Sequence, residues 1–354
     1  MKILDWYIGR AVAISSLLVM FILLALFAVT LFVGELEDVD KGTYGVLEAA
    51  QFVALTMPRL AYELFPSVAL LGCMVGLGML ANNSELLAMR AAGVSLNRIV
   101  GSVLKTGFLL MLIATVLGEF IAPMTEKIAH QLRFAAVTTD AMLYSEKGFW
   151  ARDGSQFIHI RNVFDDGSLG DISIYEVGDK QDLRAITQAG HAYYQGDAWM
   201  MQGIVRSNVS PDGVVTERKI SKSWPSLLKP DLVDVVAVNP EFLSFMGLYK
   251  YTQYLHENNL EAARYEQKLW RKIFSPLATG VMVLLAIPFI FGSLRAVPIG
   301  QRILKGALVG VVFYIANQFS GFLGLIYHVN SLATVAIPTV VFFILAVYLM
   351  RRVL

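Results

Sequence analysis

The chain has 354 residues, of which 56% are hydrophobic and 16% are Asp, Glu, Lys or Arg. Ordinary soluble domains carry about 25% charged residues, so this composition excludes a disordered chain and argues against a soluble enzyme. The net charge of +1 gives no basic field for nucleic acid, and no nucleic-acid partner is expected. The single cysteine, Cys73, leaves no internal disulfide and no cysteine-based metal cluster.

Six apolar runs are long enough to cross a bilayer, whose hydrocarbon core needs about 20 residues of helix. The first run carries no charge and no small-residue cleavage site follows it, so we predict a retained anchor rather than a signal peptide. In the second run, the spacing of Gly72 and Gly76 is typical of closely packed membrane helices. The predicted spans are residues 11–33, 64–81, 99–120, 273–292, 303–326 and 332–350. The fold class is therefore a membrane α-helical protein with six transmembrane helices.

Lysine and arginine residues concentrate in four regions outside the spans, and this bias predicts the orientation in the membrane. The four regions are the amino end, residues 82–98, residues 293–305 and the carboxyl end. We expect them to share the cytoplasmic side, which six spans permit. The acidic loop at residues 34–62 and the long segment between the third and fourth spans then lie outside.

The cytoplasmic loop between the second and third spans predicts a short helix over residues 83–92. Asn82 can cap this helix, and Glu85 three residues later can complete a capping box. Gly93 suits the left-handed position that follows a helix end. Such a helix either connects two spans, with its acid complementing the helix dipole, or docks on a partner protein. The candidate docking residues are Glu85, Leu86, Met89 and Arg90.

The segment between the third and fourth spans has the pattern of a β domain from about residue 140. Isoleucines alternate with polar residues, and turn pairs such as Asp153-Gly154 separate the runs. We predict about eight short strands in a small sandwich or roll, followed after Pro240 by a helix that leads into the fourth span. We expect the alternating isoleucines either to line an apolar interior or to pack an ordinary core. They are Ile158, Ile160, Ile172 and Ile174. The predicted domains are residues 1–122 and 263–354, with three spans each, and the outer domain at 123–262.

The sequence contains no motif for nucleotide binding, metal binding or nucleophilic catalysis. A G-x-x-x-x-G-K-[ST] loop, G-x-S-x-G, H-E-x-x-H and C-x-x-C are all absent, and the five histidines lack metal-ligand spacing. We therefore expect no catalytic residue, no metal and no cofactor in this chain. The span interiors also hold almost no ionisable groups, which weakens the hypothesis of an ion-driven secondary carrier without excluding it. An envelope scaffold or sensor that binds through its β domain is a third hypothesis.

Several short motifs spread over the chain carry a family resemblance. They are residues 4–9 (LDWYIG), 84–91 (SELLAMRA), 118–123 (GEFIAP), 147–154 (KGFWARDG), 272–277 (KIFSPL) and 289–298 (FIFGSLRAVP). Together they resemble the LptF/LptG family of lipopolysaccharide export permeases, and the resemblance covers essentially the whole chain.

The resemblance implies a six-helix half of an ABC transporter with an inserted all-β periplasmic domain that resembles a β-jellyroll. Such a subunit is a permease and not an enzyme. It extracts lipopolysaccharide from the bacterial inner membrane and passes it to a periplasmic bridge towards the outer membrane. The implied partners are the LptF permease, an LptB ATPase dimer that uses ATP and Mg, LptC, and the LptA bridge. The short helix with Glu85 is then expected to couple the permease to the ATPase.

The resemblance also implies where the lipid makes contact. Family members can carry lysines at the outer end of the first span to meet lipid phosphates, but Leu31, Glu37 and Asp38 occupy those positions here. Phosphate contacts then fall to basic residues beside the third and fourth spans, which can equally be solvated charges: Lys127, Arg133, Arg264, Lys268, Arg271 and Lys272. The first and fifth spans are expected to line a cavity for acyl chains, unless their aromatic residues simply pack or face lipid: Phe21, Phe27, Phe32, Phe313, Tyr314 and Phe319.

Overall fold

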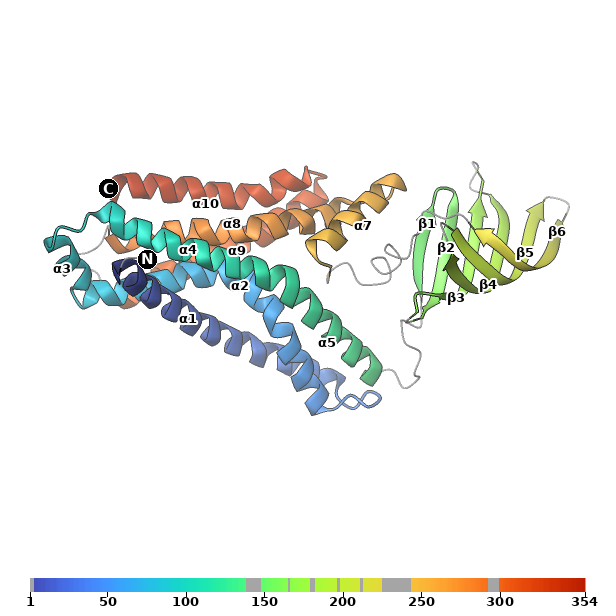
Figure 1. Ribbon diagram of the computed structural model, residues 1–354, viewed down its shortest axis with the longest axis horizontal. Coiled ribbons are helices and arrows are strands. Elements are labelled where there is room, and N and C mark those ends of the chain that lie inside the picture. Colours follow the sequence, from blue (N-terminus) through green and yellow to red (C-terminus); the bar gives the residue numbers. More distant parts are fainter. Residues whose placement is uncertain are drawn as a thin grey trace. The chain divides into compact units, whose positions relative to one another are not determined.

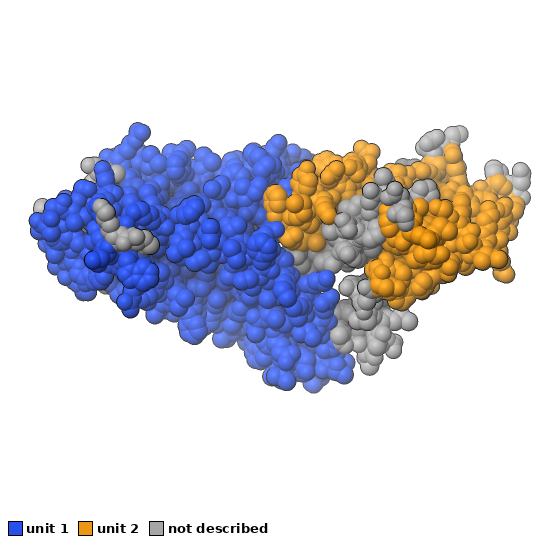
Figure 2. Space-filling model, viewed as in Figure 1, with its two compact units in different colours: residues 1–137, 263–354 blue, residues 138–262 orange. Residues whose placement is uncertain are grey.

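The chain folds into two compact units. The computed structural model describes residues 3–137, 148–164, 166–178, 182–195, 198–210, 213–224, 243–291 and 299–353. One unit is helical and combines residues 1–137 with residues 263–354, whereas residues 138–262 form the second unit (Figure 2). The second unit is therefore an insertion between two helical halves. The helical unit extends to Val137, beyond the predicted boundary at residue 122, because the third span continues as a helix.

Six helices in the described part of the chain are long and apolar enough to cross a membrane. The helical unit contains α1 (Ile3–Glu35), η1 (Leu36–Asp38), α2 (Val46–Asn82), α3 (Glu85–Ala91), α4 (Leu96–Val116), the π-helix η2 (Leu117–Ile121), α5 (Ala122–Val137), α8 (Ala263–Phe291), α9 (Ile299–Ile326) and α10 (Ser331–Val353). The predicted spans lie on α1, α2, α4 with η2, α8, α9 and α10 (Figure 1). The chain is thus a multi-pass membrane protein, as predicted.

Glycines of α2 let α1 approach it closely. A Cβ atom added to Gly72 would overlap Ser16, and one added to Gly76 would lie 2.8 Å from the carbonyl oxygen of Ala11. Residues without side chains at these positions allow the two backbones to pack together. The structure therefore confirms the predicted packing role of these two glycines.

The spans differ in how far they are buried within the chain. In the apolar segment of α2, 72% of the residues are buried within the chain. The buried share is only 6% for the apolar segment of α1 and 22% for that of α9. The core is built around α2, α4 and α8, with Leu70, Ile99 and Met282 among its buried residues. A membrane helix can leave apolar residues exposed because lipid tails cover them. Hence α1 and α9 are peripheral helices with wide apolar surfaces.

The second unit contains a six-stranded antiparallel sheet in the order β1 to β6. Its elements are β1 (Phe149–Asp153), β2 (Gln156–Val163), β3 (Leu169–Val177), β4 (Leu183–Gln195), β5 (Ala198–Ser210), β6 (Gly213–Trp224) and the helix α7 (Phe245–Glu257). Each described strand pairs with its neighbour in sequence, so these strands form a meander. About eight strands were predicted in a sandwich or roll, and residues 225–242 lie outside the described residues.

The alternating isoleucines lie together on one face of the sheet. Ile158 is opposite Ile174 and Ile160 is opposite Ile172, and all four side chains are buried. Residues two apart in a strand point to the same side. The predicted alternation is therefore confirmed, and all four residues are buried on one face of the sheet.

The two edges of the sheet differ. The Tyr254 hydroxyl of α7 accepts a hydrogen bond from the Arg152 N–H (2.8 Å) and donates one to its carbonyl (2.9 Å). Asn258, just after α7, accepts a hydrogen bond from the Gly154 N–H at 3.1 Å. These contacts occupy backbone groups of β1 and of the turn that follows it, which would otherwise be open at the edge. At the opposite edge of the described sheet, the residues of β6 are exposed up to Trp224.

Candidate functional site

The loop between α2 and α4 contains a short helix, as predicted, but its start differs. The helix α3 begins at Glu85 rather than at residue 83, and Ser84 precedes it with a positive φ of 60°. Asn82 is the last residue of α2, so the predicted capping box between Asn82 and Glu85 was wrong. A cap residue needs an extended backbone, and α2 remains helical through Asn82.

The end of α3 agrees with the prediction. Gly93 has a φ of 84°, in the left-handed region. Its N–H donates to the carbonyl of Arg90 at 3.0 Å, and the N–H of Val94 donates to the carbonyl of Met89 at 3.0 Å. This pair of hydrogen bonds is the Schellman arrangement that closes a helix end. The conformation of the chain directly after α3 is therefore fixed by backbone hydrogen bonds.

Not all of the predicted docking residues lie on the exposed face of α3. Leu86 is 1% exposed and belongs to the core of the helical unit, and Met89 packs against that core. Leu86 therefore faces the core of its own chain and offers no surface to a partner. Its apolar side chain anchors the short helix α3 to the helical bundle. The outer face carries Leu87 and Arg90, which are exposed.

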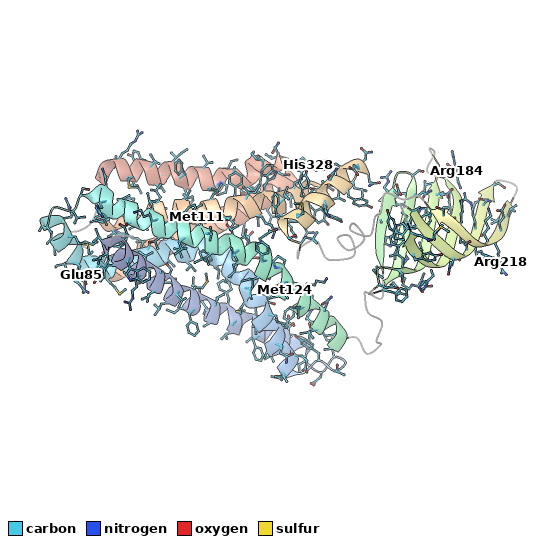
Figure 3. All side chains as sticks on the ribbon, viewed as in Figure 1. Glu85, Met111, Met124, Arg184, Arg218 and His328 are labelled. Carbon is cyan, nitrogen blue, oxygen red and sulfur yellow. The ribbon has the colours of Figure 1, made fainter. Side chains whose placement is uncertain are left out.

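Glu85 is held by two hydrogen bonds within the chain. Its Oε2 accepts from the Tyr7 hydroxyl of α1 at 2.6 Å, and its Oε1 accepts from the Asn83 Nδ2 at 3.4 Å. Its side chain is half-buried at the end of the helical unit where α3 lies (Figure 3). Sequence reasoning missed Tyr7, because no local pattern places it beside a residue 78 positions away.

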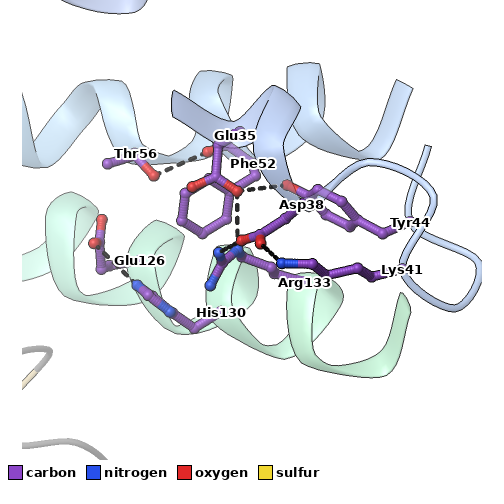
Figure 4. A network of polar contacts seen from close by, with 9 residues as sticks. All are labelled: Glu35, Asp38, Lys41, Tyr44, Phe52, Thr56, Glu126, His130 and Arg133. Carbon is purple, nitrogen blue, oxygen red and sulfur yellow. Dashed lines mark hydrogen bonds and ion pairs between the residues drawn. The ribbon is translucent and has the colours of Figure 1, made fainter. Parts of the chain in front are cut away.

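A second polar network joins α1, α2 and α5 (Figure 4). Arg133 of α5 donates from Nε to Glu35 Oε2 at 2.9 Å and also pairs with Asp38. Its guanidinium lies over the ring of Phe52, 5.4 Å from the ring centroid. Lys41 is a further partner of Asp38. The positive charge of Arg133 is thus already matched by two carboxylates.

The loop before α2 is fixed to the end of α5. The Thr43 N–H and hydroxyl both donate to the carbonyl oxygen of Ala136, at 2.7 and 3.1 Å. Gly42 has a φ of 62°, and an added Cβ would lie 2.7 Å from that same oxygen. Tyr44 is buried and donates to Glu35 at 2.9 Å; burial first, and then this hydrogen bond, raise the pKa of Tyr44 to about 12. Tyr44 therefore remains a hydrogen-bond donor across the physiological pH range.

A buried acid connects α2 to α5 further along the same helices. Oε1 of Glu126 lies 3.1 Å from the Nε of Arg59 and 3.4 Å from the Nε2 of His130 (Figure 4). The carboxyl group is almost fully buried. These contacts, like those of Arg133, fix the position of α5 relative to α2.

The predicted basic cluster is divided among several partners. Lys272 donates from Nζ to the carbonyl of Gly118 at 2.9 Å and lies 3.3 Å from Glu119, both in η2. Arg271 donates to the side chain of Gln318 and to the carbonyl of Asn317 in α9, each at 3.2 Å. The other candidates are Lys127 and Arg264, which are exposed, and the half-buried Lys268. Arg133, Arg271 and Lys272 therefore each have partners of their own within the chain, and these partners lie on different elements.

Most of the predicted acyl-chain residues lie at the surface, but one does not. Phe21 is 73% exposed and Phe319 is 64% exposed, whereas Phe27 and Phe32 are half-buried and Tyr314 is exposed. Phe313 is 4% exposed and packs edge-on against Phe342 of α10, with ring centroids 5.1 Å apart. The assignment of Phe313 to a cavity wall is therefore corrected: it belongs to the core between α9 and α10.

The comparisons with known proteins cover both units of this chain. Residues 6–352 match the family model described as "Lipopolysaccharide export system permease LptF/LptG". The chain belongs to the LptF/LptG family. This confirms the resemblance seen in the short motifs. The family is one of transporter permeases, and its match includes the inserted sheet as well as the six spans.

Two LptG relatives align with this chain over nearly its full length. The chain is 35% identical to lipopolysaccharide export system permease protein LptG of Escherichia coli (strain K12) over 353 residues, which cover 99% of this chain and 98% of the relative. It is 36% identical to LptG of Haemophilus influenzae over 351 residues, with 99% and 98% coverage. Both relatives are LptG proteins, in agreement with the stretch at residues 291–298, which resembles LptG more than LptF.

Proposed function

We propose that this chain is the permease subunit of an ABC-type lipopolysaccharide exporter. It extracts lipopolysaccharide from the bacterial inner membrane and passes it to a periplasmic bridge towards the outer membrane. The observation that carries this proposal is the family match over residues 6–352, together with LptG relatives aligned over 99% of the chain. Six membrane-long helices with an inserted sheet are compatible with that role.

The proposed orientation places both termini and α3 in the cytoplasm and the sheet in the periplasm. Within the helical unit, the start of α1 and the end of α10 lie at the same end as α3 (Figure 1). The basic residues of these regions favour the cytoplasmic side. Arg351 and Arg352 in the last turn of α10 and Arg90 of α3 supply that bias among the described residues.

The cytoplasmic end is proposed to dock on an LptB ATPase dimer, which binds the ATP and Mg. The docking surface consists of Glu85 and the exposed face of α3, with Leu87 and Arg90. Glu85 is half-buried and already oriented, so a donor from the ATPase can reach its carboxylate at a low cost in conformational entropy. Nucleotide-driven movement of the ATPase would then act on α3.

The lipid path is proposed to begin on the apolar faces of α1 and α9. Paired with an LptF subunit, these faces would enclose a cavity for acyl chains, with Phe21 and Phe319 on its wall. Lys127 is the exposed candidate for phosphate contact on α5. The path continues into the sheet unit, which we propose closes as a β-jellyroll. Its exposed β6 edge is available to a strand of LptC or LptA by backbone hydrogen bonding.

The Glu85→Ala substitution tests the proposed function. In the complete exporter reconstituted in proteoliposomes, we expect the variant to assemble but to release lipopolysaccharide about tenfold more slowly or worse, because a charge contact across the ATPase interface is lost. Glu261→Ala removes an exposed carboxylate between α7 and α8 and serves as the matched control.

Affinity purification of the full chain in mild detergent distinguishes the alternatives. Co-purification of an ATPase and of lipopolysaccharide supports the exporter. Transport by the chain alone under an ion gradient would support a secondary carrier, and a complex without bound lipid or ATPase would support a scaffold. Normal lipid release by the Glu85→Ala exporter would refute the coupling role of that residue.

A further inference from the structure

The first turns of α1 contact two different elements. The Asp5 carboxylate, which is buried, accepts hydrogen bonds from the Ser102 hydroxyl and, at 2.7 Å, from the Lys105 ammonium group of α4. Two residues later, the Tyr7 hydroxyl donates to Glu85 of α3 at 2.6 Å. Residues two apart on a helix point to different sides, so one turn can bind two neighbours at once. The start of α1 is therefore fixed to α4 and linked to α3.

The hydrogen bond from Tyr7 leaves Glu85 able to bind a partner. A carboxylate has about four acceptor positions, of which Tyr7 and Asn83 use one each. The half-buried side chain still reaches solvent. Tyr7 thus restricts the orientation of the carboxylate without blocking it.

The rest of α1 connects this contact to the proposed lipid surface. Ile8 and Val12 are buried in the core, and Ser16 lies against Gly72 of α2. Beyond Ser16 the helix leaves a wide apolar face exposed, which includes Phe21. A continuous helix transmits a displacement of its first turn along its length, so α1 links the end that touches α3 to the surface proposed to meet lipid.

We propose that Tyr7 is a positioning residue of the coupling site. It orients the Glu85 carboxylate for the ATPase subunit and ties α3 to α1, so that movement of α3 is passed to the first span. This inference rests on the proposed coupling role of Glu85. It goes further by naming the residue through which the coupling helix reaches a membrane span.

The Tyr7→Phe substitution removes the hydroxyl and keeps the ring. In the complete exporter in proteoliposomes, we expect the amount of assembled complex to be unchanged. The lipopolysaccharide released per ATP hydrolysed should fall about threefold to tenfold, the range expected for loss of one ordinary hydrogen bond at a partly exposed site. The matched control is Tyr348→Phe on α10, where the ring lies 4.7 Å from the Arg352 guanidinium and phenylalanine preserves that contact. The control should release lipid at the wild-type ratio.

A double-mutant cycle with Glu85→Ala separates positioning from a general structural effect. If Tyr7 acts through Glu85, Tyr7→Phe has no further effect in the Glu85→Ala background. An equal loss in both backgrounds would overturn the inference, as would a wild-type ratio for Tyr7→Phe beside an impaired Glu85→Ala. A wild-type ratio for Glu85→Ala itself would overturn both this inference and the coupling role on which it rests.

Discussion

At the scale of single residues, Arg133 has internal ion-pair partners that its position in the sequence did not indicate. The sequence offers it as a phosphate ligand, but in the structure it joins α5 to Glu35 of α1 and to Asp38. Arg133→Glu would place three carboxylates together. We expect it to lower the stability of the chain by about 1–2 kcal/mol, a value reduced for the partial exposure of the pair. Thermal unfolding in detergent measures this loss.

The charge-swapped pair distinguishes an internal ion pair from a lipid contact. Arg133→Glu combined with Glu35→Arg restores opposite charges between the two helices, so stability should return towards the wild-type value. Lipid loading should recover with it. A stable swapped variant that fails to load lipopolysaccharide would instead show that the Arg133 guanidinium binds the substrate.

Local residue patterns were predictable, but long-range pairs were not. Gly93, Gly72 and the alternating isoleucines follow from backbone sterics and strand periodicity, which the sequence displays directly. The contacts Arg133–Glu35 and Tyr7–Glu85 join residues 98 and 78 positions apart, and only the packing of the helices brings them together. Leu86 and Phe313 were misplaced because core, lipid and partner surfaces all favour apolar side chains, so hydropathy cannot separate them.

At the scale of elements, hydropathy located the membrane helices but not their ends. The second span was predicted from residue 64, whereas α2 begins at Val46. An apolar run marks the part of a helix that lies in hydrocarbon, while helical hydrogen bonding continues into water wherever packing supports it. For the same reason α5 extends the third span to Val137. In the sheet unit, the turn pair Asp153-Gly154 lies between β1 and β2, as the sequence indicates, but the pairing order of the strands came only from the structure.

The difference between the two edges of the described sheet leads to a prediction about the proposed LptC or LptA partner. Ile220 on β6 is 92% exposed, whereas Trp150 lies on β1, whose edge is occupied by Tyr254. A photo-crosslinker at Ile220 should capture LptC or LptA in cells, because β6 is the last strand of the described sheet and a sheet edge can accept a partner strand. The same crosslinker at Trp150, which is also exposed, should capture neither. Equal capture at both positions would argue against strand addition at β6.

At the scale of the whole molecule, the proposed exporter accounts for two features of the helical unit. The two peripheral spans leave apolar surfaces that the core of the chain does not cover, and the short helix α3 is linked to one of these spans, α1. In the proposed assembly, a second permease lies beside α1 and α9 and an ATPase contacts α3. The family match over both units supports the permease role on which this assembly rests.

The proposed cavity can be tested by lipid crosslinking at three phenylalanines that differ in burial. Photo-crosslinkers that replace Phe21 on α1 and Phe319 on α9 should capture lipopolysaccharide in the assembled exporter, because both side chains are exposed on the proposed walls. A crosslinker at Phe313, only six residues before Phe319 on the same helix, should capture none, because this position is buried against Phe342. Capture at Phe21 and Phe319 should fall when ATP hydrolysis drives lipid onward. If those two positions label only bulk phospholipid, the apolar faces of α1 and α9 contact the membrane rather than a substrate cavity.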